Sequence, residues 1–298
     1  MPIEGIGINA HSSRINGDIE LLERDVAHFK KIGFDYVEIP VHGVDGVING
    51  ELNLKSVKRV REALRRYNLK AAAHSPDPLN LRKDNFDLQE KVFQSSIEFA
   101  SELEAKVLVY HNGNFEGRKQ EDEFQNLASD REIRALRALS EFAHKRGVQI
   151  CLENGASSIE VLVTVLRKVN RENVGITYDF GHAFLYYSCH GGEKEFLTSI
   201  KEALPYLKHI HIHDNFGRAN ITSQDTPYRN RLPFGEGDLH MPPGMGKIPY
   251  EKIFPLIREY KGIAMAEIDP RYEPFYGGIV KRLYKYIEEA HVPFQSPI

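Results

Sequence analysis

Eight short apolar runs alternate with eight longer amphipathic segments along this chain, and this alternation restricts the available folds more than any other feature. The apolar runs, which are short enough to be strands, lie at residues 3–9, 36–40, 69–74, 106–111, 148–154, 174–179, 208–214 and 263–269. The amphipathic segments have a helical period and lie at residues 18–33, 53–68, 87–103, 130–147, 158–170, 193–204, 250–262 and 278–290. The pattern predicts an α/β fold, a (β/α)8 TIM barrel.

The chain has the length and composition of one such domain. Its 298 residues are 41% hydrophobic and 27% charged, as in ordinary globular proteins. No low-complexity linker divides it, so we expect a single TIM-barrel domain over residues 1–298. Gly33, Gly147 and Gly262 stand where helix ends are expected. The longest irregular segment, residues 214–249, follows the seventh strand, and loops this long are usually functional or mobile.

Charge and composition argue against several classes of protein. The formal net charge is −3, so no basic surplus drives nonspecific binding to nucleic acid. No apolar run approaches ~20 residues, and the N-terminus lacks the pattern of a signal peptide. Cys151 and Cys189 do not make a disulfide framework. We therefore expect a cytoplasmic protein without membrane contact, and leave its oligomeric state, a homo-oligomer included, open.

Acidic residues and histidines stand at the ends of the predicted strands. Seven of the eight strands carry one there, namely Glu38, His74, His111, Glu153, Asp179, His211 and Glu267. In a TIM barrel these ends converge on the active site. Carboxylates cannot crowd into a low-dielectric cleft without compensation, and a divalent cation supplies it. Mixed histidine and carboxylate sets suit zinc, manganese, iron or cobalt, so we expect a metal site.

Three stretches add polar residues to this mouth. In TYDFGHA, Asp179 and His182 follow one strand at a spacing that lets both face the same point. In the long loop, Asp238 and His240 flank Leu239, so in extended backbone they point the same way. In KHIHIHDNFG, residues 208–217, three histidines alternate with isoleucines and share one face of a strand.

These residues resemble those of the xylose isomerase-like TIM barrels, a family that includes sugar isomerases and epimerases, inosose-processing enzymes and the DNA-repair enzyme endonuclease IV. The resemblance covers essentially the whole chain. It implies a metal held by four side chains, Glu153, Asp179, His211 and Glu267. His211 and Asp214 also match the family's His-x-x-Asp pattern. His213 is then expected at the rim as a substrate contact, and His209 as a structural residue.

The metal-binding motifs resemble endonuclease IV in particular, which holds three zinc ions with nine side chains. HSPDPLNL matches its strand-three motif, VYHNG its strand-four histidine, and Asp238-x-His240 followed by GMGKI its last pair. The implied ligands are His74, His111, Glu153, Asp179, His182, His211, Asp238, His240 and Glu267. Two or three ions per chain, zinc or manganese, would follow. The chain departs from that enzyme at Asp77 and Pro78, where the enzyme has bulky residues that enter DNA.

Two functions fit this set. The first is a metal-dependent isomerase or epimerase of a sugar, sugar phosphate or keto sugar, in which Glu153 and Glu267 exchange a proton beside a metal-chelated oxygen. Its expected substrate contacts are Glu38, His182, His213 and Arg218. An aromatic wall is also expected, formed by Phe180, Phe184, Tyr186, Phe216 and Tyr272.

The second function is a multinuclear phosphoester hydrolase that resembles endonuclease IV. Arg218, Arg229 and Arg231 would then contact phosphate, although a solvated surface explains them as well. A noncatalytic binding protein is the third and least favoured interpretation. We favour the isomerase, with a small carbohydrate and not nucleic acid as partner, because the net charge of −3 and Asp77 do not suit a DNA backbone.

Overall fold

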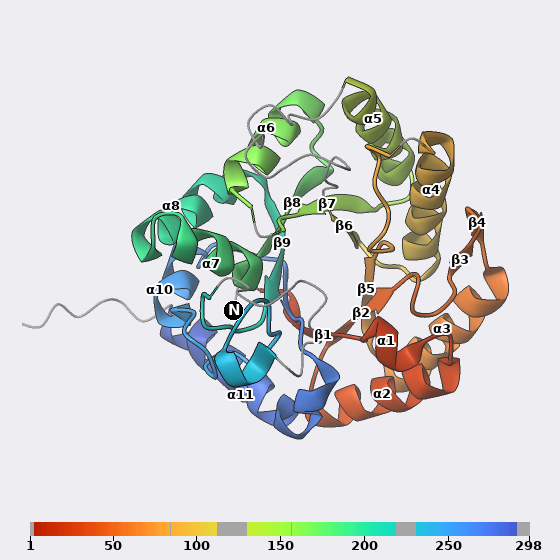
Figure 1. The fold of residues 1–298 in the computed structure, drawn as a ribbon. Helices are drawn as coiled ribbons and strands as arrows, with labels where there is room; N and C mark the ends of the chain where they lie inside the picture. The colour runs from red at the N-terminus through yellow and green to blue at the C-terminus, as the bar shows by residue number, and fades with distance from the viewer. Residues whose placement is uncertain (1–2, 84, 112–129, 156, 219–230, 291–298) are drawn as a thin grey trace, which may run out of the picture.

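The computed structural model describes residues 3–83, 85–111, 130–155, 157–218 and 231–290. At its centre parallel strands close into a barrel, and helices surround them (Figure 1). The strands follow one another around the barrel in the order β1-β10-β9-β8-β7-β6-β5-β2. The predicted TIM barrel is therefore confirmed.

Each of the eight predicted apolar runs forms one barrel strand. The strands are β1 (Gly5–Asn9), β2 (Tyr36–Pro40), β5 (Lys70–His74), β6 (Val107–His111), β7 (Gln149–Glu153), β8 (Val174–Asp179), β9 (Leu207–Ile212) and β10 (Ile263–Ala266). A short hairpin of β3 (Val47–Ile48) and β4 (Glu51–Leu52) lies outside the barrel. Every residue of β8 is buried, as expected for a strand covered on both faces.

The predicted amphipathic segments form the surrounding helices. They are α2 (Ile19–Ile32), α3 (Leu54–Tyr67), α4 (Phe86–Glu102), α5 (Asp130–His144), α6 (Ile159–Val169), α8 (Glu193–Ala203), α10 (Tyr250–Leu256) and α11 (Tyr276–Glu289). None of the helices in the described ranges is long and apolar enough to cross a membrane. The prediction for Gly262 was wrong, because α10 ends at Leu256, one residue after Pro255.

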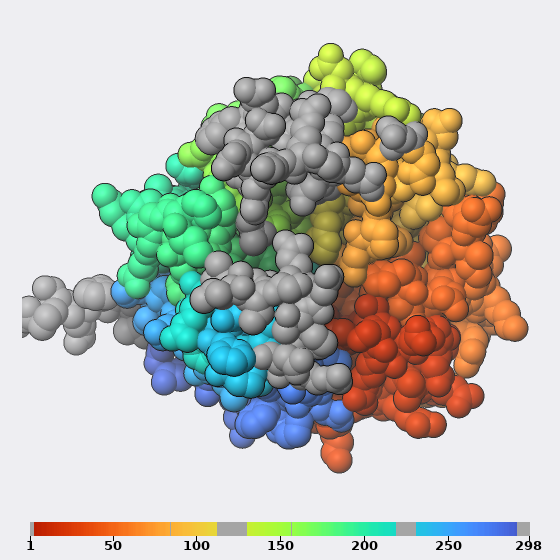
Figure 2. All heavy atoms as spheres, viewed as in Figure 1, coloured from red at the N-terminus to blue at the C-terminus, as the bar shows by residue number. Residues whose placement is uncertain are grey.

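The sequence patterns did not predict α1 (Ser12–Ile15) and α7 (Phe180–Cys189). Helix α7 follows β8 without a loop, and the Asp179 side chain caps it by accepting a hydrogen bond from the His182 N–H at 2.6 Å. The two ends of the helical ring also meet. Arg14 in α1 pairs with Glu273 at 3.0 Å, and the red and blue segments lie beside each other in Figure 2.

The barrel interior is packed and separates the two mouths of the barrel. Seven inward-facing residues fill it as one cluster, namely Tyr36, Ala72, Val107, Val109, Cys151, Ile263 and Met265. A Cβ at Gly7 would overlap the end of the Met265 side chain, so the glycine in β1 leaves room for that side chain. As in other TIM barrels, the centre is a core and not a pore.

The carboxylate of Asp214 holds the described part of the long loop, residues 231–249, against the end of β9. It accepts hydrogen bonds from the backbone N–H groups of Gly244 at 2.7 Å, Gly246 at 2.9 Å and Ile248 at 3.1 Å. A Cβ at Gly246 would overlap the Asn215 carbonyl and Asp214, so only glycine fits this approach. This clamp gives a physical reason for the GMGKI spacing and brings the preceding Asp238 and His240 to the mouth of the barrel.

Candidate metal centre

A cavity of about 420 Å³ opens at the C-terminal ends of the strands. It is within the usual size range of small-molecule sites, ~300–1,000 Å³. Sixteen residues line it, namely Asn9, Ala10, His11, Ser12, Glu38, Pro40, His42, His74, Asp77, His111, His182, Arg231, Asp238, His240, Glu267 and Asp269. Most are polar, which suits a polar ligand.

The inner group of metal-ligating side chains consists of Glu153, Asp179, His211 and Glu267. One ligand atom from each lies within 4.8 Å of the others. His211 Nδ1 is 2.9 Å from a Glu153 oxygen, 3.3 Å from Glu267 and 3.8 Å from Asp179. Glu153, Asp179 and His211 are fully buried, while Glu267 lines the cavity. The group thus connects the barrel interior to the mouth.

A second group lies towards the long loop, around Asp238. One oxygen of Asp238 is 2.9 Å from His182 Nε2 and 2.8 Å from His240 Nε2. His240 has a left-handed backbone with φ 39°, an uncommon conformation for a residue other than glycine. Its neighbours maintain that conformation, since the Asp269 N–H donates to the His240 carbonyl at 3.1 Å.

A third group lies on the opposite side of Glu153. The second oxygen of that carboxylate is 3.3 Å from His74 Nε2 and 2.8 Å from His111 Nε2. Asp77 joins these two histidines in a further cluster of ligand atoms within 4.8 Å. Glu153 therefore stands between the third group and the inner group, with one oxygen towards each.

In four of the predicted histidine ligands, one ring nitrogen is held by a hydrogen bond, which fixes the orientation of the ring. The Nδ1–H groups of His74, His182 and His240 donate to the backbone carbonyls of Ser75 at 2.8 Å, Asn154 at 2.9 Å and Glu267 at 3.1 Å. His211 is reversed, because its Nε2–H donates to Glu38 at 3.2 Å. In each ring the other nitrogen faces a carboxylate, as in metal sites where an outer oxygen sets the tautomer.

The electrostatics of the mouth match this arrangement. Burial lowers the pKa of His74, but Glu153 and Glu38 outweigh it and raise that pKa to about 10. Burial likewise opposes the charge on His211, yet Glu153 and Glu38 raise its pKa well above the ordinary value. Conversely, burial raises the pKa of Glu153, but His211 and His111 lower it well below its usual range. The buried carboxylates are therefore stabilised by positive charge beside them. Either protonated histidines or a divalent cation can supply that charge.

Unpartnered polar atoms also fit a metal. In the described part of the chain, buried Asp238 Oδ1, Glu267 Oε2 and His213 Nδ1 have no hydrogen-bond partner. Proteins rarely bury a polar atom without a partner, and a bound ion can take the partner's place. Together with the fixed tautomers, these atoms make the donor set suitable for zinc or manganese.

The structure brings the nine predicted ligands to one mouth, six lining the cavity and three buried beside it. Their role as ligands stays a prediction. Glu38, predicted as a substrate contact, lines the cavity but also lies deep enough to contact His209 at 3.3 Å and His211. His213 was expected at the rim, and that was wrong, because it is fully buried.

Other expected contacts do not reach the cavity. Arg218 is absent from the lining, and its guanidinium donates to the Phe234 carbonyl at 2.9 Å. None of the five aromatic residues predicted as a wall lines the cavity, and Phe180 is fully buried against Tyr178 and Tyr250. Arg231 does line it, whereas Arg229 lies outside the described residues.

Among the ionisable lining residues, the sequence patterns did not identify four as contacts, namely His11, His42, Asp77 and Asp269. His11 and His42 follow the first and second strands, so the strand-end rule would have found them had it been extended by two residues. His42 Nε2 lies 3.5 Å from an Asp77 oxygen. Burial lowers the pKa of both histidines, which favours their neutral forms.

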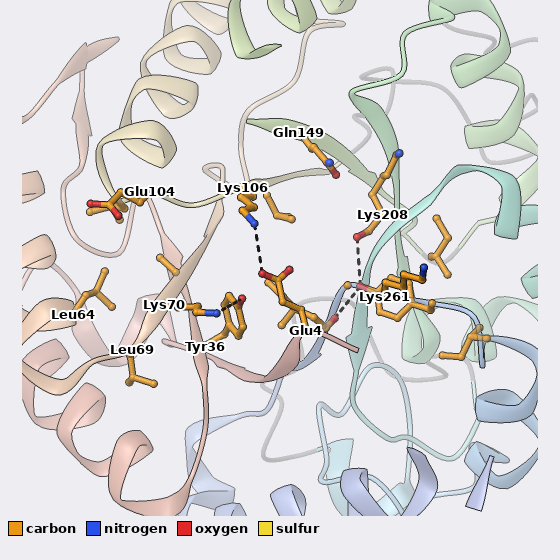
Figure 3. Close-up of a pocket in the computed structure, with 18 of the residues that line it drawn as sticks. Glu4, Tyr36, Leu64, Leu69, Lys70, Glu104, Lys106, Gln149, Lys208 and Lys261 are labelled. Carbon is orange, nitrogen blue, oxygen red and sulfur yellow. Dashed lines mark hydrogen bonds and ion pairs between the residues drawn. The ribbon is translucent and has the colours of Figure 1, made fainter. Parts of the chain in front are cut away.

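A larger cavity of about 990 Å³ lies at the other end of the barrel, beside the first residues of several strands. Figure 3 shows Lys106 directed towards Glu4, at 3.6 Å, and Lys70 beside Tyr36, where its ammonium donates to the phenol oxygen at 3.3 Å. No histidine lines this cavity, and among the described residues no cluster of metal-ligating side chains occurs there. Its size alone does not make it a catalytic site.

Comparisons with known proteins agree with this architecture. The model of the family described as "xylose isomerase-like TIM barrel" matches residues 26–288. Over 235 residues the chain is 26% identical to an uncharacterized protein of Methanocaldococcus jannaschii, covering 74% of this chain and 72% of that protein. It is 30% identical over 182 residues to an inosose dehydratase of Klebsiella pneumoniae (strain 342), covering 57% of this chain and 56% of that enzyme.

Solved structures of sugar epimerases share the fold. A D-tagatose 3-epimerase-like protein superposes with a TM-score of 0.72 at 22% identity, covering 97% of this chain and 100% of that one. An L-ribulose 3-epimerase superposes with a TM-score of 0.68 at 14% identity, covering 98% and 99%. At these identities the likeness establishes the fold alone.

Proposed function

Because the chain belongs to the xylose isomerase-like TIM barrel family, we propose that it is a divalent-metal-dependent isomerase or epimerase of a sugar or a closely related keto sugar or polyol. The observation that carries this proposal is the inner group, in which His211 Nδ1 faces three carboxylates while Glu38 holds its other nitrogen. The similar proteins, which include sugar epimerases and an inosose dehydratase, support a carbohydrate substrate.

Glu153, Asp179, His211 and Glu267 would hold the metal. When bound, a divalent cation polarises the oxygens of a keto or hydroxy sugar and makes the neighbouring C–H more acidic. Asp179 and His211 have no further role in this mechanism. Their full burial excludes water from the lower side of the site, which strengthens each electrostatic interaction there.

Glu153 and Glu267 would move the proton. They come from β7 and the end of β10, which are separated around the barrel by β8 and β9. A substrate between them therefore presents different faces to the two carboxylates, so one removes a proton from carbon while the other returns a proton to the opposite face or to a neighbouring atom. The Glu267 carboxylate lines the cavity, where a bound substrate can reach it.

The remaining wall of the cavity would bind hydroxyl groups. His11 and His42 line it, and burial lowers the pKa of both. A neutral imidazole carries one donor and one acceptor nitrogen, which suits a hydroxyl that also does both. Asp77 and Asp269 add acceptors beside them. This polar lining favours a free or lightly modified sugar.

The second candidate is a multinuclear phosphoester hydrolase, favoured by one observation. Two further groups of ligand atoms, around Asp238 and around His74 with His111, accompany the inner group. Three ions could activate water and stabilise a leaving oxygen. Against this function, the cavity of about 420 Å³ is the size of a small molecule, and the chain has a net charge of −3.

Hydrogen exchange distinguishes the two candidates. The metal-loaded protein is incubated in heavy water with a panel of ketoses, inososes and keto-glycosides, and in parallel with a DNA duplex containing an abasic site. We expect deuterium at one sugar carbon, and none with the Glu153→Gln or Glu267→Gln variants. Efficient cleavage of the duplex with no sugar exchange would replace the isomerase by the hydrolase.

A further inference from the structure

His213 belongs to the KHIHIHDNFG stretch but is given no role in the proposed reaction, although it touches the inner group. It is fully buried, directly after β9. Its Nε2 lies 3.0 and 3.1 Å from the two oxygens of Asp179, so its Nε2–H donates to that carboxylate. The ring stacks on His240 with centroids 4.1 Å apart and an interplanar angle of 17°. His213 therefore stands between the inner group and the group around Asp238.

The first turn of α7 is shaped to accept this ring. Gly181 lies against it, and a Cβ built on Gly181 would overlap its Cε1, Nδ1 and Nε2 atoms. Any side chain at position 181 would displace the imidazole. Gly181 is not in a left-handed conformation, so backbone freedom does not explain the glycine. The close approach of His213 does.

Among the described residues, the other nitrogen of His213 has no hydrogen-bond partner. Nδ1 is buried without a hydrogen bond among the described residues and lies 3.5 Å from Asp238 Oδ1, which is also unpartnered. On the other side of Asp238, the Nε2 atoms of His182 and His240 lie 2.9 and 2.8 Å from Oδ2. The Asp238 carboxylate therefore has imidazole nitrogens at both of its oxygens.

We propose that His213 Nδ1 is the fourth protein ligand of a metal ion held by His182, Asp238 and His240. One ligand atom from each of these four residues lies within 4.8 Å of the others. Three imidazoles and a carboxylate suit zinc. The inference rests on the metal dependence proposed above and adds to it a closed site, because four protein ligands leave a tetrahedral ion no position for substrate.

This closed site is structural. Asp238 and His240 belong to the loop that Asp214 clamps, whereas His182 and His213 belong to the barrel and α7. An ion bound by all four joins the loop to the barrel mouth. Through the Nε2–H bond to Asp179, the same imidazole connects this ion to the inner group. Substrate then meets only the ions of the other groups.

The test measures metal and needs no activity. The His213→Gln variant retains a side chain that reaches towards Asp179 but has no imidazole nitrogen, and the exposed His190, outside the cavity, serves as control in a His190→Gln variant. Ions per chain are counted by elemental analysis, and affinities by titration with zinc alone. We expect His213→Gln to lose one ion per chain, with a loss of affinity above the ~10–100-fold typical of an outer-shell change. His190→Gln should match the parent.

The outcomes separate this inference from the proposed function. If the parent protein binds no divalent cation, both fail. If the parent binds ions and His213→Gln binds the same number as tightly, only the role of His213 fails. Should His213→Gln not fold, nitrogen NMR of the histidine-labelled parent loaded with ¹¹³Cd decides directly. Coupling to the metal at Nδ1 of both His211 and His213 supports the proposal, and coupling at Nδ1 of His211 alone overturns it.

Discussion

The two mouths of the barrel differ in a way that cavity size does not predict. The mouth at the N-terminal ends of the strands holds about 990 Å³, and the C-terminal mouth about 420 Å³. Yet the smaller cavity collects the clustered histidines and carboxylates, whereas lysines, glutamates and leucines line the larger one. The position of the candidate site is therefore indicated by the convergence of metal-ligating atoms and not by the volume of the cavity.

The charged residues at the two mouths also differ in burial, and substitutions among them should therefore differ in effect. Glu153 and His211 are fully buried, so each depends on its partners to remain charged. At the other mouth the Lys106–Glu4 pair is largely exposed, with side-chain exposures of 75% and 37%. Exposed pairs of this kind are worth ~0–1 kcal/mol. Substitutions at the two mouths should thus differ in effect by orders of magnitude.

The largest effect is expected for Glu153→Gln. Glu153 touches His74, His111 and His211 and is one of the two proposed proton-transfer groups, so the change removes that group and a negative charge shared by three histidines. Loss of a general base alone costs roughly 10²–10⁴-fold. We expect kcat/KM for sugar exchange to fall by at least ~10³-fold, measured with deuterium incorporation. A variant within tenfold of the parent would contradict the assigned role.

Removal of metal should be the next largest effect. An ion that binds only the folded chain stabilises it by about 4 kcal/mol when its concentration is about 1,000 times Kd. Treatment with a chelator should therefore lower the thermal midpoint and abolish exchange, and zinc or manganese should restore both. The chelator should leave the Lys106–Glu4 region unaffected, which a proteolysis pattern checks. If the thermal midpoint does not change with chelator, the C-terminal mouth does not hold a stabilising metal ion.

An intermediate effect is expected for Asp214→Ala. This change leaves the N–H groups of Gly244, Gly246 and Ile248 without their acceptor. An unsatisfied buried donor costs ~1–3 kcal/mol, so we expect a total of roughly 3 kcal/mol after partial rehydration, measured by denaturant unfolding. Metal at the Asp238 group should weaken at the same time. Unfolding within about 0.5 kcal/mol of the parent, which is the size of surface effects, would refute the clamp.

The smallest effect is expected at the large cavity. Lys106→Ala removes an exposed pair with Glu4, and we expect a change in unfolding free energy below ~1 kcal/mol with no change in exchange rate or metal content. Lys208→Ala in the same lining provides a second measurement. A tenfold loss of activity in either variant would assign this mouth a part in catalysis and break the comparison.

Much of this architecture follows from the sequence. Short apolar runs and period-3.6 patterns located all eight barrel strands and eight of the surrounding helices, because burial dictates where apolar residues stand. Since parallel strands of a closed barrel share one polarity, residues at their ends, such as Glu153, Asp179 and His211, had to meet at one mouth. The parallel direction of the strands is enough to bring these residues together.

The sequence did not determine which residues each side chain contacts. Alternation placed His213 on the same face as His211, but only the packing of α7 against β9 brings Gly181 beside it and makes it buried. The start of α7 was hidden because Asp179 both ends a strand and caps a helix. Arg218 and the predicted aromatic wall were misplaced for a related reason. A loop or helix residue has no fixed direction until its element docks, and docking depends on contacts between segments far apart in the chain.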